Sequence, residues 1–199
     1  MRGSANLWVD VVLGTAVTHN DRAAIGASIA FVAIFAELLT MNSPPEQGWW
    51  VDKFVKFSGP IEGENNSLRP RGGPLEGQWS GPLWRFVKEY VPRQKGKTVL
   101  EASGLWYSGA FLLETVPTAL YILMRYADDP EEAILRAVND TKDNDTIGAI
   151  VGAAVGALHG EERLPDRWKR GLLGRTQDND DGRVFEIIEE AIRRFSRVS

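Results

Sequence analysis

Residues 137–160 read AVNDTKDNDTIGAIVGAAVGALHG and contain the most distinctive pattern of the chain, an acidic stretch followed by small and aliphatic residues. Asp143, Asp145 and Thr146 place two carboxylates and one hydroxyl within four residues, directly before a run of small and aliphatic residues. Glycine recurs every four residues at 148, 152 and 156, so these three share one face of a helix expected over residues 147–159. The spacing predicts close approach of another backbone to that face, with Gly160 ending the helix.

The acidic stretch from Asp143 to Thr146 is consistent with two roles. Carboxylates at alternate positions of one turn can face a single cation. Alternatively, Asp145 or Thr146 caps the helix that follows. An EF-hand is excluded, because position five of its loop would be Ile147 and position twelve Ala154. The residues alone leave both roles open.

The composition narrows the chemistry that the chain can perform. It has 199 residues with 43% hydrophobic and 25% charged residues, which is typical of one folded domain and excludes whole-chain disorder. The absence of cysteine excludes a disulfide scaffold, a thiolate zinc site and a cysteine nucleophile. With only His19 and His159, a three-histidine metal site is also impossible. A metal would therefore be held mainly by oxygen ligands, which favours magnesium, manganese or calcium.

Charge and hydropathy indicate which partners to expect. Residues 1–100 carry 11 Lys and Arg against 9 Asp and Glu, whereas residues 101–199 carry 12 against 18. Neither half is basic enough for duplex nucleic acid as the main partner. The apolar stretch from Ala23 to Met41 is long enough to cross a bilayer, but Ser28 and Glu37 interrupt it and no Lys/Arg cluster flanks it. We therefore expect a buried core helix, no membrane and, since residues 1–4 lack a leader pattern, a cytoplasmic location.

Periodicity and capping residues predict helices throughout and no strand. Asp21 or Asn20 is expected to cap the helix from residue 21, and an Asp of the pair 128–129 to cap the helix that has Pro130 in its first turn. Two regions are ambiguous or irregular: residues 58–83 hold six glycines and four prolines and predict a long loop, and Pro117 either lies in the first turn of a helix or kinks it. The expected helices cover residues 21–41, 49–57, 83–90, 105–127, a segment after Asp128–Glu132, 147–159, a short one around Trp168 and a last one after Gly182.

Residues 137–160 resemble the C-terminal signature of the ADP-ribosylglycohydrolase family, in which an aliphatic and Asn lead-in precedes Gly-Gly-Asp-Thr-Asp-Thr and a small-residue helix. Three other segments also resemble that family, in the same order along the chain. They are Thr18–Asp21, similar to a Thr-His motif before an Ala-rich helix; Ser108–Leu120, similar to the substrate-side segment; and Leu164–Trp168, similar to a Pro-x-x-Trp motif. The resemblance covers essentially the whole chain.

The resemblance implies an all-α orthogonal helical bundle, one domain over residues 1–199, and a binuclear Mg²⁺ or Mn²⁺ centre that cleaves the glycosidic bond between ADP-ribose and a protein side chain. By this resemblance Asp143 and Asp145 are catalytic, and together with Thr146 they are metal ligands. His19 is implied to contact the substrate, and Ala110 and Phe111 to lie near the adenine. The structural alternatives are a capping or core role for His19 and a core role for Phe111.

The chain also departs from the family pattern. Thr141-Lys142 replaces the usual Gly-Gly, and Lys142 is expected to neutralise the neighbouring acids or to bind phosphate as a point charge. The family's N-terminal metal-binding motifs are not found, so we expect an N-terminally truncated bundle that starts at an internal methionine and has half of the metal shell. A homo-oligomer or a complementing chain is then an expected partner. The alternatives are a non-catalytic ADP-ribose or cation-binding module and a helical interaction protein.

Overall fold

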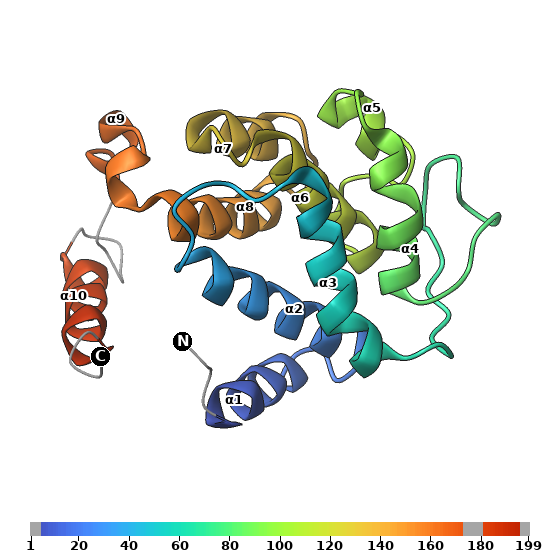
Figure 1. Cartoon of the computed structure of the whole chain (residues 1–199), viewed down its shortest axis with the longest axis horizontal. Coiled ribbons are helices and arrows are strands. Elements are labelled where there is room, and N and C mark those ends of the chain that lie inside the picture. The colour runs from blue at the N-terminus through green and yellow to red at the C-terminus, as the bar shows by residue number, and fades with distance from the viewer. Residues whose placement is uncertain (1–4, 173–180, 196–199) are drawn as a thin grey trace. The chain divides into compact units, whose positions relative to one another are not determined.

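The computed structural model describes residues 5–172 and 181–195, and the described chain is helical apart from one isolated β-bridge between Leu68 and Gly81. The all-α prediction is confirmed. The chain divides into two compact units, residues 1–163 and 164–199, which are described separately. The α-helices are α1 Ala5–Ala16, α2 Arg22–Leu38, α3 Gln47–Glu62, α4 Leu83–Tyr90, α5 Val99–Ser103, α6 Leu112–Tyr126, α7 Pro130–Asn139, α8 Asn144–His159, α9 Asp166–Lys169 and α10 Arg183–Phe195 (Figure 1). Two 3₁₀ turns, Pro92–Gln94 and Glu161–Arg163, complete the described elements.

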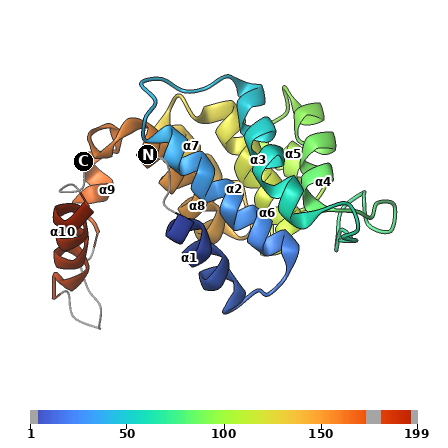
Figure 2. The same cartoon turned by 60° about the horizontal axis from the view of Figure 1, so that its bottom comes forward.

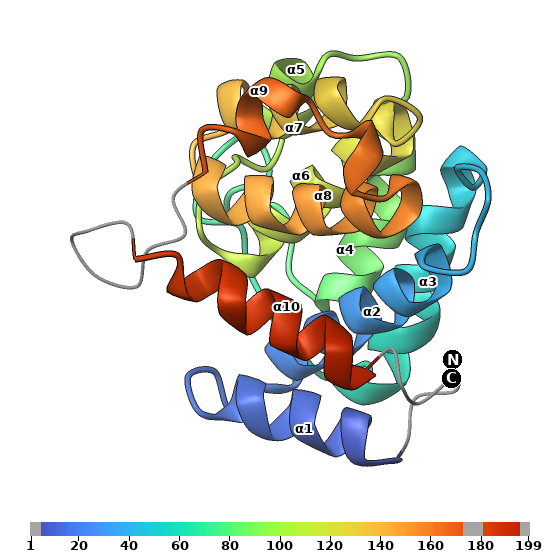
Figure 3. The same cartoon turned by 90° about the vertical axis from the view of Figure 1, so that its left-hand side faces the viewer.

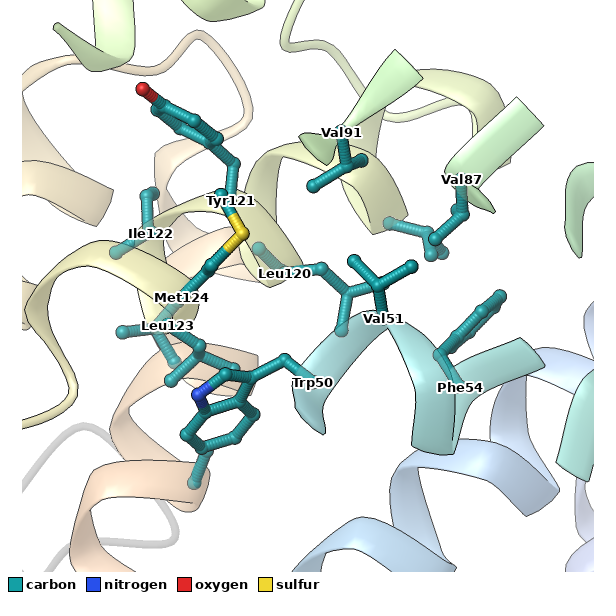
Figure 4. Close-up of a cluster of buried hydrophobic side chains, with 14 of the residues drawn as sticks. Trp50, Val51, Phe54, Val87, Val91, Leu120, Tyr121, Ile122, Leu123 and Met124 are labelled. Carbon is teal, nitrogen blue, oxygen red and sulfur yellow. The ribbon is translucent and has the colours of Figure 1, made fainter. Parts of the chain in front are cut away.

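Helix α6 is the centre of the first unit. Residues 113–124 are buried without a break, because the helix is apolar on every side apart from a few hydroxyls and Glu114. A helix that is hydrophobic all round must be covered on all sides. Helix α6 accordingly packs against α2, α3, α4, α5, α7 and α8 (Figure 2). The helices around it supply most of the remaining core side chains, of which Trp50 and Phe54 of α3 are among the largest (Figure 4).

Helix α2 is a core helix, as its composition predicts. Asp21 caps it by accepting a 2.9 Å hydrogen bond from the Ala24 N–H, and ten of its residues are buried, mostly against α3. The small alanine side chains along α2 allow the two helices to approach closely. Within the described residues, no helix combines the length and the apolarity needed to cross a bilayer.

Several elements differ from the sequence expectation. Helices α1 and α5 were not predicted, and α3 continues through Pro60 to Glu62, so the long loop spans residues 63–82 and not 58–83. Pro60 removes one backbone hydrogen bond, but the helix still closes because the Gly63 N–H donates to the Gly59 carbonyl. Helix α6 begins at Leu112, between the two expected starts at Leu105 and near Thr115, so Pro117 lies inside it and not in its first turn. Residues 104–111, expected to be helical from Leu105, form the connection from α5 to α6.

Helices α7 and α8 lie side by side (Figure 3), and the expected capping of α7 is confirmed. The Asp129 carboxylate accepts from the Glu132 N–H at 3.1 Å, and Pro130 occupies the first turn. The expected close packing along the glycine face of α8 is wrong for two of three positions. A Cβ at Gly148 would lie 3.3 Å from Val138, whereas one at 152 or 156 would meet no described atom within 4 Å.

The second unit consists of two helices in its described part. Helix α9 is the short helix expected around Trp168, and Asp166 in its first turn forms an ion pair with Lys169 at 3.0 Å. Helix α10 follows Gly182, as its periodicity predicts. Its exposed apolar side chains include Phe185, Ile188 and Ile192.

Candidate functional site

The acidic cluster, defined as Asp143, Asp145 and Thr146, lies at the N-terminus of α8. Asp143 is half-buried, and the other two residues are exposed. Asp143 occupies the capping position, yet its side chain makes no capping hydrogen bond to the α8 backbone. Its Oδ2 atom is buried without a hydrogen-bond partner among the described residues. A buried, unsatisfied carboxylate oxygen is costly, so helix capping does not account for this side chain.

Burial is the main cause of a raised pKa at Asp143, and the neighbouring Asp145 carboxylate raises it further. The pKa of Asp145 is lowered, first by the Thr146 N–H, which donates to its Oδ1 at 2.8 Å, and then by hydrogen bonding with Asp143. Asp143 therefore keeps its proton to a higher pH than Asp145 does. Both side chains can offer carboxylate oxygen to a cation.

The segment from Tyr107 to Phe111 holds the start of α8 in place. The backbone N–H groups of Lys142 and Asp143 donate to the Ser108 carbonyl at 3.2 and 2.9 Å. The Lys142 N–H also donates to the Ser108 hydroxyl at 3.1 Å. Since Ser108 is itself buried, the backbone before α8 has a fixed position, and the direction of the Asp143 side chain follows from it.

Glu114 is a buried acid beside this segment that the sequence analysis did not select as a site residue. Its Oε2 accepts from the Gly109 N–H at 3.1 Å, and a Cβ at Gly109 would lie only 2.6 Å from that oxygen. Burial raises the pKa of Glu114, the Gly109 N–H and the Arg71 charge lower it, and the Asp143 charge raises it. Glu114 is the only charged residue in the stretch 112–124, and this interruption was the available signal.

Two cations reach the same segment from elsewhere in the chain. The Arg71 guanidinium, from the loop 63–82, lies 4.0 Å from the centre of the Phe111 ring. The Lys142 ammonium lies 3.7 Å from the centre of the Tyr107 ring. Phe111 also packs partly against the core, so its ring is shared between the core and Arg71. A ligand that stacks on the outer face of Phe111 must share that face with Arg71 or displace it.

Among the described residues, no hydrogen bond or ion pair joins His19 or Ala110, the remaining residues expected at the site, to the acidic cluster. His19 lies in the connection between α1 and α2, where its Nδ1 is 2.9 Å from the Thr18 hydroxyl. Ala110 is exposed next to Phe111 and so lies on the segment that holds α8. His159 bonds through Nε2 to the Ala127 carbonyl at 2.6 Å, which gives it a structural role.

The acidic cluster fits a partial cation site. Its donors are two carboxylates and a hydroxyl, all oxygen, and one carboxylate oxygen is buried and unpaired. Mg²⁺ is commonly held by one or two protein carboxylates together with water and substrate phosphate. In residues 5–172 and 181–195, no group of three or more Asp, Glu, His or Cys side chains converges as a metal site. These residues therefore do not form a complete cage.

Comparison with known proteins agrees with the motifs. The protein-family model described as ADP-ribosylglycohydrolase matches residues 5–197. The curated protein ADP-ribosylhydrolase ARH3 of Gallus gallus is 25% identical over 174 residues, which cover 79% of this chain and 45% of the chicken protein. The Bos taurus protein of the same name is 31% identical over 77 residues, 34% of this chain and 21% of the bovine protein.

The match to these relatives is partial in length. The Xenopus tropicalis ADP-ribosylhydrolase ARH3 is 29% identical over 110 residues, which are 49% of this chain and 31% of the frog protein. The chain thus spans less than half the length of each of these curated relatives. No solved structure matches the chain significantly.

Proposed function

The chain belongs to the ADP-ribosylglycohydrolase family, and from this premise we propose that it takes part in hydrolysis of the glycosidic bond between ADP-ribose and a protein side chain. The observation that carries the proposal is the buried and unpaired Oδ2 of Asp143 beside Asp145 and Thr146. A carboxylate kept in this state at a stability cost is typical of a functional group.

The acidic cluster is proposed to hold Mg²⁺ or Mn²⁺. A bound dication would supply stabilisation of developing negative charge and a lowered pKa for a bound water. Asp143 and Asp145 would supply carboxylate oxygens to the cation, and the Thr146 hydroxyl would add a neutral oxygen donor. Ser108 keeps the start of α8 fixed, so the two carboxylates are oriented before the cation arrives.

The substrate side of the proposed site is the segment that contains Ala110 and Phe111. Glu114, buried behind this segment, is a positioning residue because its carboxylate fixes the Gly109 backbone. His19 is retained in the proposal as a substrate contact because of the Thr-His motif alone. Further cation ligands would come from water, from substrate phosphates or from another polypeptide segment, such as a second copy or a complementing chain. The cytoplasmic location remains a prediction.

Calorimetry tests the proposal with the intact chain. Mg²⁺ and then ADP-ribose are titrated into the parent and into Asp145→Ala, and release of ADP-ribose from a modified peptide is measured for both. Binding and release by the parent that the variant loses support the hydrolase. Binding without release supports the second candidate, a non-catalytic ADP-ribose or cation-binding module. The unchanged binding of Mg²⁺ by the variant would refute the role of the acidic cluster.

A further inference from the structure

The segment from Tyr107 to Phe111 carries an aromatic ring at each end, and a cation from a distant part of the chain lies over each ring. We propose that Arg71 and Lys142, named here the basic clamp, bind the diphosphate of ADP-ribose. This inference rests on the proposed function, because it names the part of the same ligand that these two residues recognise.

Arg71 is brought to the segment by the docking of the loop 63–82. Gly73 has a φ of 76°, and a Cβ there would lie 2.8 Å from the Leu105 carbonyl oxygen, so only glycine allows this approach. Leu75 of the same loop is buried in the core. The base of the loop is closed by Glu62, which accepts from the Leu83 and Trp84 N–H groups at 2.7 and 3.1 Å. Arg71 is therefore exposed but held on an anchored loop.

Lys142 is positioned by two neighbouring residues of the segment, Tyr107 and Ser108. Its N–H is bonded to Ser108, and the ring beneath its ammonium belongs to Tyr107, which has a φ of 72°. A non-glycine residue in this region costs free energy and is found where the surrounding structure enforces it, often at functional sites. The strained backbone at Tyr107 turns the segment so that its ring lies under Lys142, directly beside the acidic cluster.

The two cations are available to an anion. Within residues 5–172 and 181–195, neither Arg71 nor Lys142 forms an ion pair within 4.0 Å, although the Arg71 charge lowers the pKa of Glu114. A guanidinium presents a planar fork and an ammonium a point charge, and both bind phosphate oxygens strongly. The two cations lie over rings four residues apart on one segment, so a diphosphate would offer each of them a negatively charged phosphate. A cation in the acidic cluster would offset the negative charge there.

The experiment compares ADP-ribose with adenosine, which lacks the diphosphate. Dissociation constants are measured by calorimetry in Mg²⁺ buffer for the parent, Lys142→Ala, Arg71→Ala and the control Arg69→Ala, an exposed arginine on the same loop. We expect ADP-ribose to bind about 10-fold more weakly to each clamp variant, since charge-assisted hydrogen bonds are lost. We also expect a shallower salt dependence for these variants. Adenosine binding to Lys142→Ala and ADP-ribose binding to Arg69→Ala should stay within about 2-fold of the parent. Unchanged ADP-ribose affinity in both clamp variants would overturn the inference.

Titration of pyrophosphate in metal-free buffer separates this inference from the proposed function. Pyrophosphate binding that depends on Arg71 and Lys142 supports the clamp, even if ADP-ribose is not released from a modified peptide. Release by the parent with an unchanged KM in both clamp variants overturns the clamp and leaves the hydrolase in place. A parent that binds neither ADP-ribose nor pyrophosphate also overturns the clamp.

Discussion

Replacing Asp143 by asparagine is expected to raise the free energy of unfolding of the metal-free protein while removing its cation binding. The parent side chain has a buried Oδ2 without a partner among the described residues, and its charge faces the Asp145 carboxylate. Asparagine has nearly the same shape but no charge, and its amide can donate to Asp145. A gain in metal-free stability together with a loss of cation binding is expected only if the Asp143 carboxylate serves a ligand.

The size of the gain follows from the burial of a single atom. An unsatisfied buried polar group costs about 1–3 kcal/mol, and because Asp143 is only half-buried we expect about 1 kcal/mol. For a chain of this size that is a rise of about 2–4 °C in Tm. A cation present at about 100 times its Kd would stabilise the parent by about 2.7 kcal/mol and the variant by nothing, which reverses their order.

Urea unfolding followed by tryptophan fluorescence measures the free energy of unfolding of the parent and of the variant, once in EDTA and once with Mg²⁺. The difference should also depend on pH. Since the pKa of folded Asp143 is raised, its contribution to parent stability is complete below the unfolded pKa and is lost as pH rises through the folded pKa. The advantage of the variant in EDTA should therefore be absent in acid and grow toward neutral pH.

A metal-free Asp143→Asn variant that is less stable than the parent by about 1 kcal/mol would refute this reasoning. That result would mean that the carboxylate supports the start of α8 as a cap. Equal stabilisation of parent and variant by Mg²⁺ would show that the cation binds elsewhere. Asn144→Ala, an exposed change in the first turn of α8 that leaves both carboxylates in place, is the matched control and should keep the response to Mg²⁺.

Three further predictions concern the scaffold of the site. Glu62→Ala should lower the free energy of unfolding by about 2–3 kcal/mol, because the N–H groups at the start of α4 lose their acceptor, and thermal or urea unfolding checks this. Burial raises the pKa of Glu62, so the contribution of this side chain to the free energy of unfolding is complete below its unfolded pKa and is lost as pH rises through the folded pKa. The loss of stability caused by Glu62→Gln should therefore become smaller between acid and neutral pH. Gly109→Ala should destabilise the chain by about 1–3 kcal/mol, because its Cβ would contact Glu114, and should weaken ADP-ribose binding measured by calorimetry. Gly152→Ala, where a Cβ meets open space, should stabilise the chain by about 0.5–1 kcal/mol. Equal changes in the free energy of unfolding of the two variants would contradict the packing argument.

Local signals predicted the features that depend on a few neighbouring residues. The caps Asp21 and Asp129, the helix after residue 143 and the short helix at Trp168 each depend on backbone groups within three or four positions. The end of α3 was not predictable in this way. Pro60 normally indicates a break, but the helix continues to Glu62, whose carboxylate is bonded to backbone 21 and 22 residues further along the chain.

The residues of the candidate site also fall into those that local sequence signals predict and those that only the fold brings together. The sequence selected Asp143, Asp145, Thr146 and Phe111 through motif and composition. It did not select Glu114 or Arg71 as site residues. Arg71 is 40 residues from the ring that it covers, and no periodicity links the two. The prediction of close packing along the glycine face of α8 is wrong at Gly152 and Gly156, because a repeat of small residues permits close packing but does not supply a neighbour.

Short stretches of sequence suffice to predict the helical class, the family and the acidic residues at the start of α8, because propensity, capping and motif are local properties. The folded arrangement is needed to find that Asp143 keeps an unpaired oxygen and that Ser108 fixes the backbone before it across 34 residues. It is also needed to find that Arg71 and Lys142 lie over the rings of one segment. Burial and the pairing of charges depend on which distant segments share the same space. Close packing of the helices around α6 sets that arrangement, and no local pattern records it.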